Sequence, residues 1–172
     1  MQPRTAVLIL TIMSFFGFGS KVKALEPGDA APHVSAIDQN GQPFDFAAAY
    51  TKGVTLVYFY PKADTPGCTA QACSLRDSFE NLKAENLQII GVSRDTSESQ
   101  KKFEQKYNLP FPLIADKDGK VAEAFGVPGI LGMPVSSRQS FLIKGDKIVW
   151  KSASAKTRDH AAEVQAALDA LK

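Results

Sequence analysis

Two cysteines, Cys68 and Cys73, have the strongest capacity for chemistry in this sequence of 172 residues. Cys68 follows a loop of turn-forming residues and opens a helical pattern, so its sulfur should lie beside the N–H groups at a helix start. That position favours the thiolate, which is the nucleophilic form of cysteine. The pattern therefore predicts attack by a thiolate on an electrophile.

Hydrogen-bond donors accompany Cys68 in the sequence. Thr65, which Pro66 holds in an extended conformation, offers a hydroxyl, and the helix start offers the backbone N–H groups of Gly67 and Cys68. Donors of this kind stabilise the negative charge that moves onto the leaving oxygen when an O–O bond breaks. Pro61 and Pro66 are expected to stiffen the loop and shield it from water.

The spacing of the two cysteines argues against a permanent disulfide. On an intact helix, residues five apart lie roughly 8 to 9 Å from each other and about 140° apart around the axis. A disulfide needs Cα atoms closer than about 7 Å. A bond between Cys68 and Cys73 would therefore require the helix to unwind, which favours a transient redox pair over a structural bridge.

The inventory of metal-binding residues is small. The two cysteines are accompanied by two histidines, His33 and His160, which lie far from them in the sequence. These residues are too few for a structural zinc site. We interpret both histidines as surface or packing residues, and Trp150 and residues 58–60 as part of the core.

A specific resemblance is carried by the loop before the first cysteine. The run Pro61-Lys62-Ala63-Asp64-Thr65-Pro66-Gly67-Cys68 resembles the peroxiredoxin signature, in which a proline, three residues, a threonine and two residues precede the reactive cysteine. The longer segment 58–77 is similar to the branch called peroxiredoxin Q or bacterioferritin comigratory protein. Similarity of order and spacing extends over nearly the whole chain after residue 25.

This resemblance implies a thioredoxin-like fold and a peroxidase that reduces hydrogen peroxide and organic hydroperoxides without a metal or organic cofactor. It implies that Cys68 is the peroxidatic cysteine and Cys73 the resolving cysteine of an intramolecular disulfide, which a thioredoxin-type dithiol protein reduces. It also implies that Thr65 hydrogen-bonds the thiolate and the peroxide. Pro61 would shield the site, and Arg138 would support the thiolate.

Two other functions remain open at this point. One is an exported thiol–disulfide oxidoreductase, although the sequence contains no Cys-x-x-Cys pair. An insulin-reduction assay beside a peroxide assay would distinguish this oxidoreductase from a peroxidase. The other is a non-catalytic binding or holdase domain with inert cysteines, which predicts ordinary alkylation reactivity at Cys68.

The site needs a strand before its loop and a helix after it, and hydrophobic patterns predict both. The continuous apolar run over 54–60 indicates a buried central strand, and apolar residues at spacings of three and four predict a helix over 68–86. Further strands are predicted over 34–37, 87–93, 112–115, 140–143 and 147–150, the last two as a hairpin, and helices over 97–107, 120–125 and 159–171. This order predicts an α/β protein with a thioredoxin-like fold, in which a central mixed β-sheet has helices on both faces.

The first 24 residues resemble a secretory signal peptide. Residues 1–23 contain no acidic residue, Arg4 lies near the start, and an apolar run covers 6–18. That run of about 14 residues is shorter than the roughly 20 needed to span a bilayer, and Ala24 ends a suitable cleavage site. We therefore predict a cleaved signal peptide over 1–24, one peroxiredoxin domain over 25–172, and export to the periplasm or secretion.

The charge pattern restricts the expected partners. The formal charge is +2, and loss of Arg4, Lys21 and Lys23 would leave −1. Basic and acidic residues are interspersed, so neither nucleic acid nor an anionic membrane is an expected partner. We expect a peroxide substrate, a thioredoxin-like protein reductant, no stable membrane association after cleavage, and a monomer.

Overall fold

A five-stranded sheet forms the centre of the protein, whose computed structural model describes residues 23–131 and 133–172. Most of the predicted signal segment thus lies outside the described residues. The strand order is β5-β4-β3-β6-β7. Strands β3, β4 and β5 are parallel to one another, and β6 is antiparallel to both of its neighbours, β3 and β7. The strands are β3 (Val54–Phe59), β4 (Leu87–Ser93), β5 (Leu113–Ala115), β6 (Ser140–Lys144) and β7 (Lys147–Ser152). The predicted mixed sheet is confirmed.

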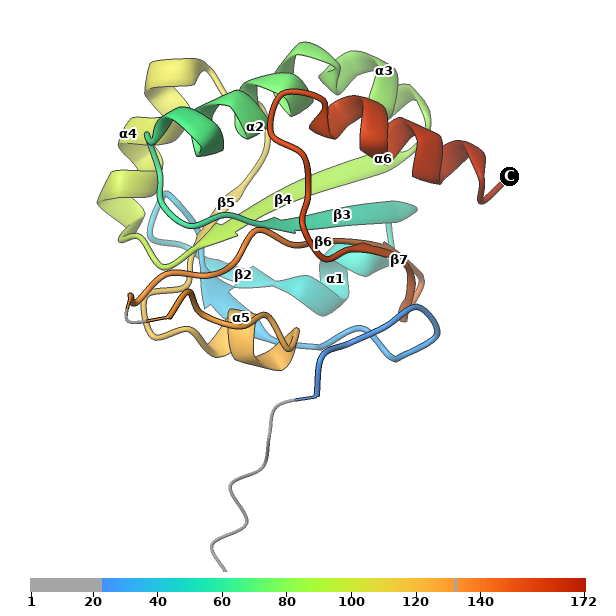
Figure 1. Cartoon of the computed structure of the whole chain (residues 1–172), viewed down its shortest axis with the longest axis horizontal. Helices are drawn as coiled ribbons and strands as arrows, with labels where there is room; N and C mark the ends of the chain where they lie inside the picture. Colours follow the sequence, from blue (N-terminus) through green and yellow to red (C-terminus); the bar gives the residue numbers. More distant parts are fainter. Residues whose placement is uncertain (1–22, 132) are drawn as a thin grey trace, which may run out of the picture.

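Helices cover both faces of the sheet, as predicted (Figure 1). One face carries α2 (Pro66–Asp77), α3 (Phe79–Ala84), α4 (Ser97–Tyr107) and α6 (His160–Asp169), and the other carries α1 (Phe46–Tyr50) and α5 (Lys120–Ala124). Successive side chains of a strand point to opposite faces. Tyr58 therefore packs in the core under α2, whereas Val57 and Phe59 pack in the core beside α1 and α5.

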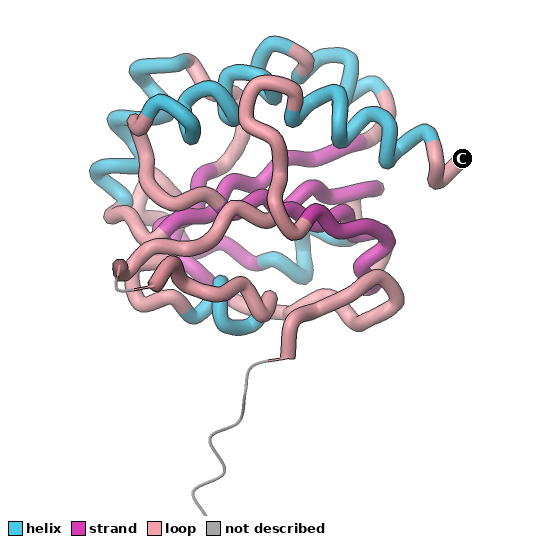
Figure 2. The backbone as a smooth tube through the Cα atoms, viewed as in Figure 1, coloured by secondary structure: helices cyan, strands magenta, loops and turns pink. Residues whose placement is uncertain are grey.

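Several short features differ from the prediction. The helix predicted over 68–86 is interrupted at Ser78, whose φ of −103° and ψ of 6° are not helical. Leu75 and Leu82 are buried on opposite sides of this break, so the apolar spacing continued through two helices and concealed it. β2 (Pro43–Asp45), which pairs with β1 (Ser35–Ile37), and α1 were not predicted. Figure 2 shows that these elements are short and lie in a segment that is otherwise loop. They are too short for a periodic pattern to identify them.

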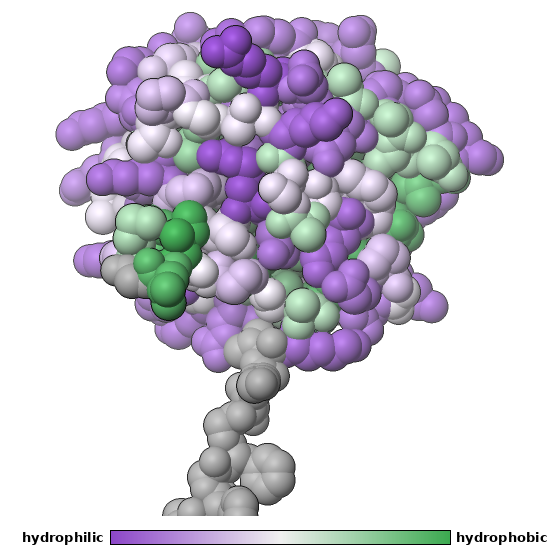
Figure 3. All heavy atoms as spheres, viewed as in Figure 1, coloured by the Kyte–Doolittle hydropathy of each residue, from purple (hydrophilic) through white to green (hydrophobic). Residues whose placement is uncertain are grey.

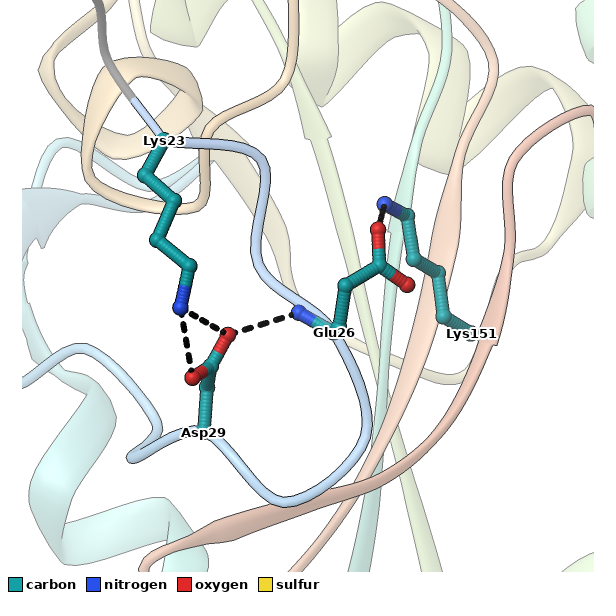
Figure 4. A network of polar contacts seen from close by, with 4 residues as sticks. All are labelled: Lys23, Glu26, Asp29 and Lys151. Carbon is teal, nitrogen blue, oxygen red and sulfur yellow. Dashed lines mark hydrogen bonds and ion pairs between the residues drawn. The ribbon is translucent and has the colours of Figure 1, made fainter.

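The first described residues run beside β7 and are held by polar contacts (Figure 4). The carboxylate of Asp29 accepts hydrogen bonds from Lys23 Nζ and from the Glu26 N–H, both at 2.9 Å. Lys151 on β7 pairs with the Glu26 carboxylate at 2.7 Å, and the Ile148 N–H donates to the Asp29 C=O at 3.0 Å. The chain after residue 23 is thereby joined to the sheet edge, and the domain boundary at residue 25 stays a prediction.

Most large apolar side chains are used in the two cores. Figure 3 shows mainly hydrophilic side chains on one face of the molecule, with apolar ones in small patches. Within the described residues, the large apolar side chains with substantial exposure are Ile37, Leu131 and Met133. None of the helices in the same part of the chain has the length and apolar character required to cross a membrane.

Candidate active site

Cys68 lies in the first turn of α2. The helix begins at Pro66, with Thr65 as its N-cap, and the Thr65 C=O accepts a hydrogen bond from the Thr69 N–H at 2.8 Å. Proline suits this first position because its φ matches the helix and its missing N–H would have no helical partner. Cys68 is only 2% exposed. The predicted position at a helix start is confirmed, although the helix begins two residues earlier than predicted.

Arg138, 70 residues further along the sequence, contacts the sulfur of Cys68. Its Nη2 atom donates a hydrogen bond to Cys68 Sγ at 3.3 Å. Arg138 precedes β6, which pairs with β3, and the Phe59 N–H at the end of β3 donates to the Gln139 C=O at 2.7 Å. A Cβ atom at Gly67 would lie only 3.3 Å from Arg138 Nη2. The sheet pairing and the small residue at position 67 together bring the guanidinium to the sulfur.

The other two residues expected near the sulfur make different contacts. The Thr65 hydroxyl donates to the Lys62 C=O at 3.0 Å, and its side chain makes no capping hydrogen bond. Pro61 is half-buried at the start of the loop, directly after the buried Tyr60. The structure thus brings Cys68 and Arg138 together directly, whereas Thr65 contributes the backbone of the helix start.

A buried chain of polar side chains extends from Arg138. Arg138 Nη1 donates to Gln71 Oε1, Gln71 Nε2 lies 3.2 Å from His160 Nδ1, and His160 Nε2 lies 2.9 Å from Ser140 Oγ. Gln71, Ser140 and His160 are all fully buried. Burial lowers the pKa of His160 to about 4; nearby Glu163 opposes this shift and Arg138 adds to it. His160 is therefore neutral at neutral pH.

These hydrogen-bonded polar side chains were not predicted from the sequence. Gln71 follows Cys68 by three residues, so helical spacing could have placed the two on one face of α2. His160 is 89 residues from Gln71 and has no local signal that links it to the cysteine. The interpretation of His160 as a packing residue was incomplete, because its ring is buried but both ring nitrogens have polar partners.

The loop before Cys68 is held by α4. Asp64 has a left-handed φ of 59°, a conformation that aspartate tolerates better than most residues. Its carboxylate accepts hydrogen bonds from Lys106 Nζ at 2.8 Å and from Tyr107 OH at 2.7 Å. These bonds, that of Lys106 foremost, hold the pKa of Asp64 below its ordinary value. The loop conformation is therefore fixed by residues about 40 positions away.

A second polar network supports the same loop from beneath. The Ala63 N–H donates to Asp95 Oδ2 at 2.8 Å, and Ser93 Oγ donates to the same oxygen at 2.6 Å. Gln100 Nε2 donates to Ser93 Oγ at 2.9 Å, and Tyr60 OH donates to Gln100 Oε1 at 2.5 Å. Each donor has an acceptor in this chain, so the network rigidifies the ends of β3 and β4.

The second cysteine lies on the same helix. Both cysteines are free thiols, and Cys73 is partly exposed, five residues after Cys68 in the intact α2. Helix geometry separates their Cα atoms by roughly 8 to 9 Å, beyond the reach of a disulfide. No group of three or more His, Cys, Asp or Glu side chains in residues 23–131 and 133–172 is placed to hold a metal ion.

The mixed sheet with helices on both faces, and a buried cysteine at the start of the helix after its central strand, define a thioredoxin-like protein with a thiol-based site. The profile of the AhpC/TSA family matches residues 27–152. The chain belongs to this family. The predicted fold and the resemblance to the peroxiredoxin Q branch are both confirmed by its relatives.

Two curated relatives carry peroxiredoxin names. Peroxiredoxin Bcp from Escherichia coli is 42% identical over 142 residues, which cover 79% of this chain and 90% of that protein. Chloroplastic peroxiredoxin Q from Arabidopsis thaliana is 43% identical over 122 residues, which cover 71% of this chain. The matched region spans only 56% of the length of the Arabidopsis protein.

Two solved structures share the fold. Peroxidoxin BcpB from Mycobacterium tuberculosis has a TM-score of 0.80 and 34% identity, covering 86% of this chain and 99% of that chain. A bacterioferritin comigratory protein from Xanthomonas campestris, studied for alkyl peroxide reduction, has a TM-score of 0.74 and 26% identity, covering 83% and 99%.

The prediction that the protein is exported to the periplasm or secreted is wrong. The relatives with a named compartment are chloroplastic. A segment without acidic residues and with an early basic residue is also typical of organelle transit peptides. The composition of residues 1–24 therefore does not by itself indicate a secretory signal peptide.

Proposed function

We propose that this chain is a thiol peroxidase that reduces hydrogen peroxide and organic hydroperoxides with the thiolate of Cys68. The observation that carries this proposal is the hydrogen bond from Arg138 to a buried sulfur in the first turn of α2. Burial disfavours an isolated charge, and a guanidinium together with the N–H groups of a helix start offsets that cost. The peroxiredoxin names of the relatives support the same activity.

In the proposed first step, the Cys68 thiolate attacks one oxygen of the peroxide. A sulfur–oxygen bond forms while the O–O bond breaks, and the leaving oxygen takes a proton and departs as water or an alcohol. Cys68 is oxidised to a sulfenic acid, and the peroxide is reduced by two electrons. Arg138 and the N–H groups at the start of α2 stabilise the charge that moves from sulfur to oxygen.

Thr65 and Pro61 have supporting roles in this proposal. The Thr65 hydroxyl, which donates to the Lys62 C=O, would turn toward the peroxide when it enters. Pro61 would limit access of water at the start of the loop. Both roles rest on the matched signature positions.

In the proposed second step, Cys73 resolves the sulfenic acid. The Cys73 thiolate attacks Cys68 Sγ, an S–S bond forms while the S–O bond breaks, and the sulfenic oxygen takes a proton and leaves as water. The first turns of α2 must unwind, because the intact helix holds the two Cα atoms too far apart. A thioredoxin-type dithiol protein would then reduce the disulfide, completing a cycle for peroxide detoxification and redox homeostasis in a monomeric enzyme.

Variants of the two cysteines test the cycle. Cys68→Ser should lose peroxide consumption, because serine cannot form the attacking thiolate. Cys73→Ser should keep one rapid turnover and then stop with a sulfenic acid at Cys68. Stopped-flow measurement with hydrogen peroxide and mass spectrometry of both cysteines would record these outcomes. Sustained turnover by Cys68→Ser would refute the proposal.

A matched pair of arginine variants tests the contact that carries the proposal. Arg138→Lys keeps the charge but loses the forked geometry that contacts Cys68 and Gln71 together. We expect the rate constant for hydrogen peroxide to fall by about 100-fold, at the lower end of the range seen when one transition-state donor is lost. Arg158→Lys makes the same change at an exposed position and should react like the wild type. Equal rates for both variants would contradict the role of Arg138.

A further inference from the structure

His160 joins three elements beneath the site. It is the first residue of α6 and is fully buried. Its Nδ1 atom faces Gln71 on α2 at 3.2 Å, and its Nε2 atom faces Ser140 on β6 at 2.9 Å. Its ring packs against Tyr58 on β3 in an edge-to-face arrangement, with centroids 5.8 Å apart. Both ring nitrogens therefore have polar partners, as buried polar groups require, and one of these partners is the residue that contacts Arg138.

The donors and acceptors in this chain allow one arrangement of protons. The guanidinium of Arg138 has donors only, so the atom of Gln71 that faces it must be the carbonyl Oε1. The amide NH₂ of Gln71 then points to His160, whose Nδ1 must accept. The ring proton is therefore on Nε2, which donates to Ser140 Oγ.

We propose that His160 is a positioning residue of the thiol site: by accepting a hydrogen bond from the Gln71 amide, it fixes the Gln71 carbonyl toward Arg138 and so aims Arg138 Nη2 at Cys68 Sγ. This inference rests on the proposed function of Cys68. His160 has no hydrogen bond to the sulfur itself in the described structure, so it acts through Gln71 and Arg138.

Reversal of this arrangement of protons would break the series of hydrogen bonds from Ser140 to Arg138. A proton on Nδ1 would face the NH₂ group of Gln71, and rotation of that amide would place NH₂ against the donors of Arg138. The charged and titratable groups that face the ring are Arg138, Glu163 and Tyr58. Burial outweighs the attraction of Glu163 and keeps the ring neutral, so the order of donors persists at neutral pH.

Two substitutions separate positioning from packing. His160→Phe keeps a ring of similar volume but removes the acceptor for Gln71. His160→Asn loses ring volume but keeps an oxygen acceptor near the place of Nδ1. A packing role predicts that phenylalanine is the milder change, whereas a positioning role predicts that asparagine is. The exposed His33, which pairs with Asp146 at 3.1 Å, provides the control His33→Phe.

The rate of hydrogen peroxide reaction and the rate of Cys68 alkylation by iodoacetamide would be measured at pH 7 in the Cys73→Ser background. We expect His160→Phe to slow the peroxide reaction by about tenfold or more, as loss of an outer partner of a functional group does elsewhere. It should also slow alkylation, and His160→Asn should recover both rates to within about threefold of the parent. His33→Phe should change neither. A folded His160→Phe that matches the parent, or that exceeds His160→Asn, would overturn the inference.

A spectroscopic measurement keeps the inference testable if a variant fails to fold. The ¹⁵N chemical shifts of the His160 ring in the otherwise unaltered protein should show a protonated Nε2 and a bare Nδ1, and the opposite tautomer would overturn the inference. If the unaltered protein does not react with peroxide, the proposed function fails. The alkylation rates and the tautomer would then still decide the role of His160.

Discussion

The hydroxyl of Tyr107 donates a 2.7 Å hydrogen bond to the carboxylate of Asp64. Tyr107 is the last residue of α4, and Asp64 lies in the loop that leads into Cys68. Because Asp64 has a left-handed φ of 59°, the contact secures the loop at a backbone conformation that few residues adopt. α4 thereby stabilises the arrangement in which Cys68 meets Arg138.

Tyr107→Phe is predicted to speed disulfide formation. The substitution keeps the ring that packs on Phe103 but removes the hydrogen bond to Asp64, so the loop and the start of α2 should open more easily. We expect the step from sulfenic acid to disulfide to be about threefold faster, measured by quenched-flow mass spectrometry. Tyr50→Phe removes a hydroxyl that donates to the Pro32 C=O at 3.1 Å and serves as control. A step no faster than in this control would show that Tyr107 does not restrain the loop.

Gly67→Ala is predicted to separate stability from activity. Alanine in a helix is more stable than glycine by roughly 0.5 to 1 kcal/mol, and no left-handed φ prevents it here. The new Cβ would lie 3.3 Å from Arg138 Nη2 and should displace the guanidinium by a few tenths of an ångström. We expect a midpoint of urea unfolding equal to or above that of the wild type, with peroxide reaction slowed by about threefold to tenfold.

The control for this variant is Gly129→Ala, whose Cβ would meet its nearest neighbour at an ordinary 3.4 Å. It should leave the rate unchanged. A Gly67→Ala protein that reacts at the wild-type rate would show that Arg138 does not need its present approach to the sulfur.

Ala70→Gly is predicted to act on the resolving step alone. Ala70 lies between the two cysteines on α2, and glycine inside a helix costs about 1 kcal/mol. Unwinding of this turn should therefore be favoured about fivefold, with a matching increase in the rate of disulfide formation. Ala166→Gly makes the same change on α6 and should leave the step unaltered. Similar rates for both variants would mean that unwinding of α2 does not limit the step.

The stability of the protein is predicted to fall in mild acid through His160. Burial lowers its pKa to about 4 in the folded protein, against about 6.5 for an unfolded histidine. Between these values the unfolded chain binds more protons, so stability decreases as the pH falls. The contribution of His160 to the free energy of unfolding should be fully present above about pH 6.5 and lost near pH 4. This is a change of about 3 kcal/mol. Urea unfolding at several pH values should show a weaker dependence for His160→Phe, and equal dependence would contradict the assignment.

The local features of the site could be predicted from the sequence. The apolar run 54–60, the loop with two prolines and the helical spacing after Cys68 are properties of neighbouring residues, and local geometry alone sets them. The same is true of the order of strands and helices, from which the mixed sheet follows. The cellular compartment of the protein could not be predicted in this way, since the composition of residues 1–24 fits more than one kind of targeting segment.

The reactive centre, a cysteine in the first turn of a helix that follows a buried strand, could therefore be predicted from local sequence. The groups that surround this sulfur depend on tertiary contacts. The pairing of β3 with β6 brings Arg138 to Cys68, and the packing of α6 on α2 brings His160 to Gln71. These contacts join residues 70 to 89 positions apart, and no local periodicity specifies them, because they arise when sheet register and helix packing fix the positions of whole elements.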